Sequence, residues 1–130
     1  MAPHITAIYA AVVGLWAVVL SNYVSTMRGK YKILHGDGGN TEMAAVIRRF
    51  GNLTEYVPLA LILLGMAEAS GLPSAWTHGL GILLVVSRLV HPFGVSVAKP
   101  ANPLRIVGTV GTHIVTAGAA LYILWTAFFV

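Results

Sequence analysis

The sequence contains no cysteine and very little charge. Only 9% of its 130 residues are Asp, Glu, Lys or Arg, against 57% hydrophobic residues, and only four residues are acidic. Without cysteine the chain has no disulfide, no thiolate metal ligand and no cysteine nucleophile. Soluble domains carry about 25% charged residues, so this composition favours a polytopic membrane protein over a soluble enzyme. The length leaves no room for a second domain of ordinary size.

Four long apolar stretches account for most of the chain. They predict helices at about residues 5–27, 42–70, 74–96 and 103–129, the second with Thr41 as its N-cap. Each stretch exceeds the roughly 20 residues that cross a hydrocarbon core about 30 Å thick. We therefore expect residues 1–130 to form a single all-α domain, an integral membrane four-helix bundle in contact with the lipid bilayer.

The basic residues lie at the ends of the apolar stretches. The first and third breaks and their flanks contain Arg28, Lys30, Lys32, Arg48, Arg49, Lys99 and Arg105, whereas the N-terminus and the second break contain none. By the positive-inside rule, we expect the first and third loops to be cytoplasmic and both termini to lie on the non-cytoplasmic side. The basic residues form no solvated run with interleaved aromatic residues, so no nucleic-acid partner is predicted.

A stripe of polar residues interrupts the second apolar stretch. Arg48, Asn52 and Glu55 are spaced by four and then three residues, which places them on one face of a helix. The run that follows, from residue 56 to residue 67, has no charge. A charged side chain costs about 2.5–3.5 kcal/mol at the centre of a membrane helix, so such residues mark a functional site by default.

Topology predicts the neighbours of this stripe. Arg88 and His91, at the end of the third stretch, and Arg105, at the start of the fourth, should reach the same depth on the cytoplasmic side. Three arginines then face one carboxylate, which predicts a polar pocket for an anionic small molecule, because guanidinium groups bind carboxylates through paired hydrogen bonds. Two alternatives remain: Arg48 and Arg105 could reach the lipid head groups, and Glu55 could form a structural pair with Arg88. No His, Asp or Glu set has metal-ligand spacing, so no metal is predicted.

The second apolar stretch has an Arg-x-x-x-Asn-x-x-Glu-Tyr-x-Pro pattern, formed by Arg48, Asn52, Glu55, Tyr56 and Pro58. This pattern resembles the second helix of the MAPEG family, the membrane-associated proteins of eicosanoid and glutathione metabolism, in its bacterial form. The segment SRLVHPFG at 87–94 is similar to the end of the third helix, and PLRIVG at 103–108 to the start of the fourth. The likeness covers the whole chain.

The resemblance implies a homotrimer in a bacterial inner membrane, with glutathione held between neighbouring subunits near the cytoplasmic face. The residues implied to bind glutathione are Arg48, Asn52, Glu55, Tyr56, Arg88 and His91. Arg105 would be catalytic, because a cation near a thiol lowers its pKa and stabilises the nucleophilic thiolate. The implied function is a glutathione-dependent transferase or peroxidase acting on lipophilic electrophiles or hydroperoxides.

The chain departs from the family where several members have tyrosines near the end of the third helix. Phe93 stands in that stretch, and no tyrosine occurs between Tyr56 and Tyr122. This difference motivates an alternative function, a non-enzymatic membrane protein that stabilises or regulates a partner complex. A transporter subunit is a further alternative, but the sequence has no inverted repeat to support it.

Overall fold

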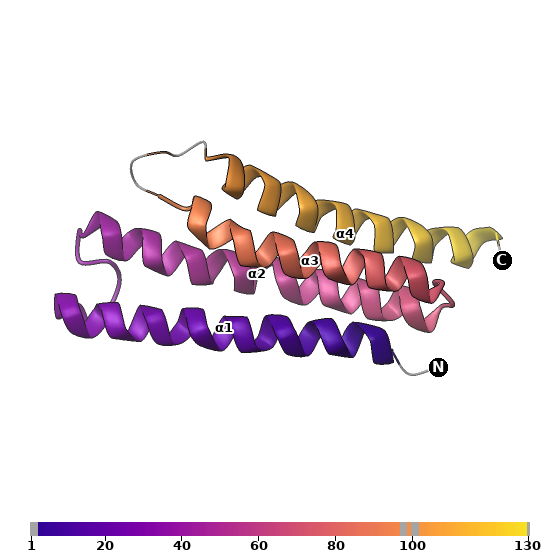
Figure 1. Cartoon of the computed structure of the whole chain (residues 1–130), viewed down its shortest axis with the longest axis horizontal. Helices are drawn as coiled ribbons and strands as arrows, with labels where there is room; N and C mark the ends of the chain where they lie inside the picture. Colours follow the sequence, from indigo (N-terminus) through magenta and orange to yellow (C-terminus); the bar gives the residue numbers. More distant parts are fainter. Residues whose placement is uncertain (1–2, 97–98, 100–101, 130) are drawn as a thin grey trace.

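The computed structural model describes residues 3–96, 99 and 102–129, and it is all-α as predicted. Four helices run antiparallel in chain order: α1 (His4–Tyr31), α2 (Thr41–Ala69), α3 (Ser74–Gly94) and α4 (Pro103–Phe129). The first and third connections lie together at one end of the bundle, and both termini and the second connection lie at the other (Figure 1). We call the end with the first and third connections the basic end, because the basic residues of the predicted cytoplasmic loops belong to it.

The helix boundaries differ from the predicted ones by up to four residues. α1 continues to Tyr31 and ends at Lys32, which has a left-handed conformation with φ 55° and donates its N–H to the carbonyls of Arg28 and Gly29. The N-cap of α2 is Asn40 and not Thr41 as predicted, because the Asn40 side chain accepts a hydrogen bond from the backbone N–H of Met43. α3 ends at residue 94, two residues before the predicted end.

α2 and α3 form the centre of the bundle. α2 contacts each of the other three helices, and within the described chain α1 and α4 do not contact each other. An apolar cluster of Val13, Leu20, Leu53 and Val57 joins α1 to α2, and a second of Ala60, Leu84 and Val115 joins α2, α3 and α4. Residues that line a site on α2 are therefore within reach of α3 and α4.

A carboxylate caps the N-terminus of α1, at the end of the bundle opposite the basic end. Glu68 of α2 accepts hydrogen bonds from the backbone N–H groups of Ile5 at 2.9 Å and Thr6 at 2.8 Å. The first N–H groups of a helix have no partner within the helix, and a negative charge there interacts favourably with the helix dipole. The sequence gives no local sign of this contact, since its partners are more than 60 residues apart.

Three of the four helices are long and apolar enough to cross a membrane, judged by length and composition: α1, α2 and α4. α3 is not among them, although its 21 residues span about 31 Å at about 1.5 Å per residue. α3 contains the polar residues Arg88 and His91. These two side chains are only 2% exposed, so α3 turns its polar residues into the bundle.

Candidate functional site

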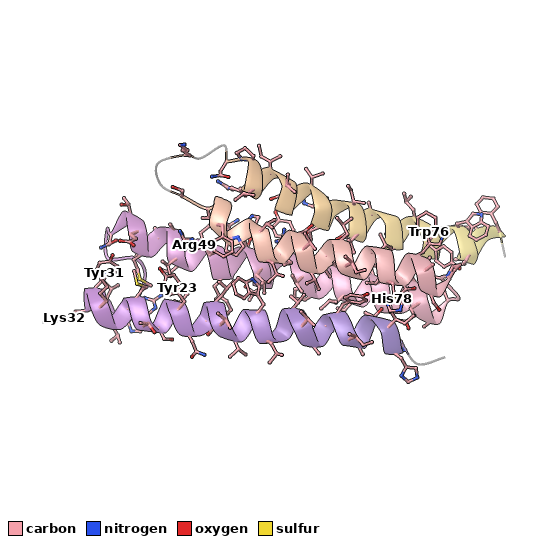
Figure 2. The ribbon with its side chains drawn as sticks, viewed as in Figure 1. Tyr23, Tyr31, Lys32, Arg49, Trp76 and His78 are labelled. Atoms are coloured by element: carbon pink, nitrogen blue, oxygen red, sulfur yellow. The ribbon has the colours of Figure 1, made fainter. Side chains whose placement is uncertain are left out.

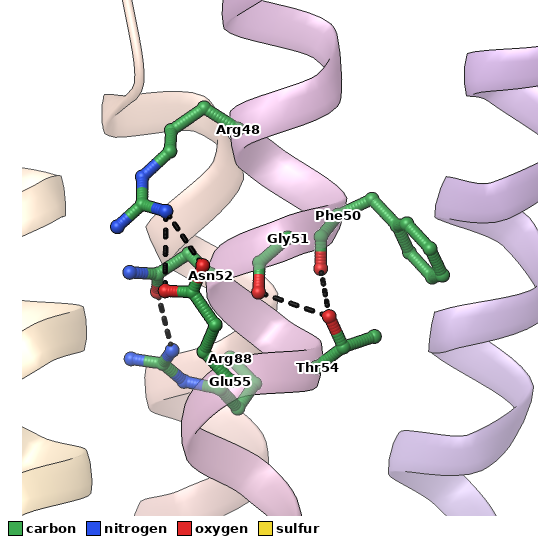
Figure 3. A network of polar contacts seen from close by, with 7 residues as sticks. All are labelled: Arg48, Phe50, Gly51, Asn52, Thr54, Glu55 and Arg88. Carbon is green, nitrogen blue, oxygen red and sulfur yellow. Dashed lines mark hydrogen bonds and ion pairs between the residues drawn. The ribbon is translucent and has the colours of Figure 1, made fainter.

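The polar stripe of α2 forms an ion pair on the surface of the bundle. Arg48 Nη1 lies 2.8 Å from Glu55 Oε1 and 3.1 Å from Glu55 Oε2, across two turns of the same helix (Figure 3). Both side chains are about half exposed, at 48% and 52%. Glu55 therefore pairs with Arg48, and the alternative in which Glu55 pairs with Arg88 is not what the structure contains.

Arg88 instead joins three helices through neutral acceptors. Its Nη1 donates to Asn52 Oδ1 of α2 at 2.9 Å (Figure 3). Its Nη2 donates to the backbone carbonyl of Gly108 in α4. Asn52 is 7% exposed and Arg88 only 2%. A charge buried in this way is tolerated only when hydrogen bonds satisfy it, so this link also fixes the positions of α2, α3 and α4.

The absence of a side chain at Gly108 makes the link possible. A Cβ atom built at this position would lie 2.7 Å from the carbonyl oxygen of Ser87 and 2.7 Å from His91 Cβ. α4 can therefore approach the backbone of α3 closely only at a glycine. The close approach brings the Gly108 carbonyl to the Arg88 guanidinium.

The backbone carbonyl of Arg88 accepts a hydrogen bond from α1. Pro92 stands four residues after Arg88 inside α3 and has no N–H to donate to that carbonyl. The indole Nε1 of Trp16 in α1 donates to it at 3.1 Å. Sequence reasoning gave Trp16 no role, although a proline in a membrane helix leaves an acceptor that a neighbouring donor can fill.

His91 is buried beside the link between α3 and α4. Its side chain is 2% exposed, and a Cβ built at Gly108 of α4 would lie 2.7 Å from its own Cβ. His91 Nε2 and Arg88 Nε are buried and have no hydrogen-bond partner among the described residues. Buried polar atoms of this kind are usually satisfied by water or by a ligand. Arg88 and His91 thus lie inside the bundle, and each has one polar atom still available.

Tyr56 and Arg105 lie on the outside of the cluster. Tyr56 is 37% exposed, and its ring centroid lies 5.6 Å from that of His113 in α4. Arg105 is exposed in the first turn of α4, where the backbone passes closely against Gly94 of α3. Of the seven predicted site residues, Asn52, Arg88 and His91 are thus buried within one subunit, and the other four are accessible to a ligand.

A cavity of about 310 Å³ lies beside the accessible half of the site. It is lined by Gly36, Asp37, Ala44, Ile47, Arg48, Gly51 and Glu55. Its first two lining residues belong to the loop between α1 and α2, which Arg28 holds by donating from Nη1 to the Gly36 carbonyl at 2.8 Å. The ion pair therefore faces a space that the first loop covers, of the size of small-ligand sites.

Comparison with known proteins agrees with the motif in α2. The MAPEG family model matches residues 6–125, which include the four helices almost completely. The chain belongs to the MAPEG family. It is also 36% identical over 90 residues to the inner membrane protein YecN of Escherichia coli K12, a match that covers 69% of each chain. The YecN protein of Escherichia coli O6:H1 matches to the same extent.

Family membership makes this protein a membrane protein of the glutathione and eicosanoid metabolism family. The three apolar helices and the kinship with an inner membrane protein support an integral location in a bacterial inner membrane. Within the described ranges, no group of three His, Asp or Glu side chains could hold a metal ion.

Proposed function

We propose that this MAPEG protein is a glutathione-dependent transferase or peroxidase that acts on lipophilic substrates. The observation that carries the proposal is the Arg48–Glu55 pair, half exposed and facing a cavity of about 310 Å³. An exposed ion pair contributes only about 0–1 kcal/mol to stability, so a ligand can separate it at small cost. Two opposite charges that a ligand can separate suit a zwitterionic ligand.

Glutathione has two carboxylates and one ammonium group, which complement these side chains. Arg48 would bind a carboxylate with two hydrogen bonds, and Glu55 would accept the ammonium group. Tyr56 would donate its hydroxyl to the bound peptide. Asn52 and Arg88 would hold α2 in place from within the bundle, since their hydrogen bonds to each other leave them buried.

Arg105 would stabilise the thiolate of bound glutathione. In a transferase reaction the thiolate sulfur attacks an electrophilic carbon, a carbon–sulfur bond forms, and the leaving group departs with its electron pair. In a peroxidase reaction two glutathione molecules reduce one hydroperoxide to an alcohol and water and are oxidised to the disulfide. The electrophile or the hydroperoxide, being lipophilic, would reach the site from the bilayer. The many exposed large hydrophobic side chains of the helices suit contact with that bilayer.

A homotrimer would complete the site. The rings of Tyr56 and His113 lie against each other in the middle of two apolar helices, and both side chains are exposed on a single subunit. Polar groups exposed to hydrocarbon are costly, so we expect this face to be covered by a second copy of the chain. The family resemblance implies three copies, with glutathione between neighbours.

The proposal is tested by titrating glutathione into the detergent-solubilised protein in a calorimeter. We expect Glu55→Gln to weaken binding about tenfold or more, because losing one charged hydrogen bond costs about 1.5–3 kcal/mol. Glu42→Gln is the matched control, since Glu42 lies near the same end of α2 and is bonded to Tyr31 instead. Equal binding by the two variants would contradict the assignment of Glu55.

Turnover separates the enzyme from its non-enzymatic alternative. With chlorodinitrobenzene or cumene hydroperoxide as second substrate, we expect Arg105→Ala to lower kcat much more than it weakens glutathione binding. Lys99→Ala controls for the loss of a cation near the start of α4, since Lys99 is exposed in the connection that precedes this helix. Glutathione binding without any turnover by the wild type would favour a regulatory protein, and absence of binding would refute the proposed function.

A further inference from the structure

A second cavity opens on another side of the basic end. It has a volume of about 380 Å³ and is lined by Trp16, Val19, Leu20, Tyr23, Arg49, Pro92 and Phe93. The lining residues come from α1, α2 and α3, and most are apolar. We call this cavity the α1–α3 groove. It differs from the cavity at the polar stripe because Arg48 and Arg49, being consecutive, point about 100° apart around α2.

The polar residues of the groove, Tyr23 and Arg49, lie at the end of the groove that is near the end of α3. Arg49 donates from Nε at 3.2 Å and from Nη2 at 2.9 Å to the carbonyl of Val95, the first residue after α3. α1 and α2 extend beyond the end of α3 at the basic end (Figure 1). Figure 2 shows Tyr23 and Arg49 towards this end of the bundle. Trp16 precedes Tyr23 by seven residues and so lies about 10 Å deeper along α1.

The charge of Arg49 is not neutralised by any described residue. The chain has four acidic residues, and each has a different partner. Glu55 pairs with Arg48, Glu68 caps α1, Glu42 accepts from the Tyr31 hydroxyl, and Asp37 accepts from the backbone N–H of Gly39. A half-buried guanidinium at the edge of an apolar groove therefore needs an anion from outside the subunit.

We infer that the α1–α3 groove binds one anionic phospholipid. The phosphate group would lie against Arg49 and the Tyr23 hydroxyl, and an acyl chain would follow Val19 and Leu20 towards Trp16. Guanidinium groups bind phosphate through paired hydrogen bonds, and basic pockets between membrane helices on the cytoplasmic side bind anionic lipid head groups. The polar outer end and the apolar inner end match the two parts of a phospholipid.

The inference is tested by quenching of Trp16 fluorescence with brominated lipids. Trp76→Phe and Trp125→Phe leave Trp16 as the only tryptophan and alter side chains that are 69% and 52% exposed. In bilayers with a small fraction of brominated lipid, we expect dibrominated phosphatidylglycerol to quench Trp16 at about fivefold lower mole fraction than dibrominated phosphatidylcholine. That ratio corresponds to about 1 kcal/mol for one basic residue near a charged head group.

The preference should depend on Arg49. We expect Arg49→Gln to abolish it and Arg49→Lys to retain part of it, whereas Lys99→Gln, the matched control, leaves it unchanged. If Arg49→Gln does not fold, displacement in the wild type decides. Unbrominated phosphatidylglycerol should relieve the quenching, whereas unbrominated phosphatidylcholine and inorganic phosphate should not.

Four results would overturn the inference. Equal quenching by the two lipids would indicate ordinary contact with the bilayer, and a preference that persists in Arg49→Gln would locate the lipid elsewhere. Relief of quenching by inorganic phosphate would indicate a site for the free anion. Protection of Trp16 from every brominated lipid would show that protein, and not lipid, fills the groove.

Discussion

Gly108→Ala is the substitution that tests the link between α2, α3 and α4 most directly. The added Cβ would lie 2.7 Å from the Ser87 carbonyl oxygen and from His91 Cβ, whereas ordinary contact begins near 3.4 Å. Neither neighbour is the flexible end of a side chain. α4 must therefore move away from α3 by roughly 0.7 Å, and the hydrogen bond from Arg88 Nη2 to the carbonyl of residue 108 must lengthen.

The expected loss of stability follows from three contributions. Overpacking of a tight contact costs about 1–3 kcal/mol, and weakening a hydrogen bond to a charged group adds part of its value of about 1.5–3 kcal/mol. Alanine has a higher helix propensity than glycine, which offsets about 1 kcal/mol of this loss of stability. We therefore expect Gly108→Ala to lower the free energy of unfolding by about 2 kcal/mol.

The measurement is reversible unfolding in mixed micelles as the fraction of denaturing detergent is raised. Gly14→Ala is the matched control, because Gly14 is also inside a helix and a Cβ there would meet nothing within 4 Å. The control should be as stable as the wild type or slightly more so. Equal stability of the two alanine variants would refute the reasoning, since it would show that α3 and α4 have room to separate.

The same substitution should also affect catalysis. Arg105 precedes Gly108 by one turn of α4, so a shift of the helix moves the guanidinium that is proposed to stabilise the thiolate. Small displacements of a catalytic group can cost about 100-fold in rate. Gly108→Ala should therefore reduce kcat of glutathione conjugation more than it weakens glutathione binding.

Two further predictions concern contacts between helices. Asn52→Ala removes the acceptor of the buried Arg88, so it should lower the free energy of unfolding by about 2 kcal/mol in the same micelle titration, and an unchanged midpoint would contradict the link. Glu68→Gln removes the charge that caps α1, so it should cost about 1 kcal/mol and speed hydrogen exchange of the Ile5 and Thr6 amides, whereas Glu42→Gln should leave those two amides unchanged.

Local patterns in the sequence were sufficient to predict the four helices and their antiparallel order. Long apolar runs separated by turn residues have few ways to fold in a membrane, because every backbone group must be hydrogen-bonded within the helix. Short connections then force neighbouring helices to be antiparallel. The same patterns did not determine the helix ends. Asn40 and not Thr41 is the N-cap of α2, and both residue types can accept a hydrogen bond from the first turn of a helix.

The same patterns could not separate the buried half of the site from the exposed half. Topology gives the depth of a side chain in the membrane but not the direction in which it points around the helix. Arg88 points inward because α4 approaches α3 closely at Gly108, a contact between residues 20 positions apart. The contacts that Glu68 makes with α1 and Trp16 with α3 are longer in sequence still, so no local signal predicts them.

The division of the site also changes how its charge acts on a ligand. Arg48 and Glu55 cancel each other, whereas the charge of Arg88 is satisfied by neutral oxygens and is not cancelled. With Arg105, the four charged groups leave two positive charges, three cations against one anion. Glutathione with an ionised thiol has a net charge of two negative units, one more than the thiol form, so under the proposed function this field would favour the bound thiolate. Arg88 would thus assist ionisation without touching the peptide, because charges in a medium of low dielectric act over longer distances than in water.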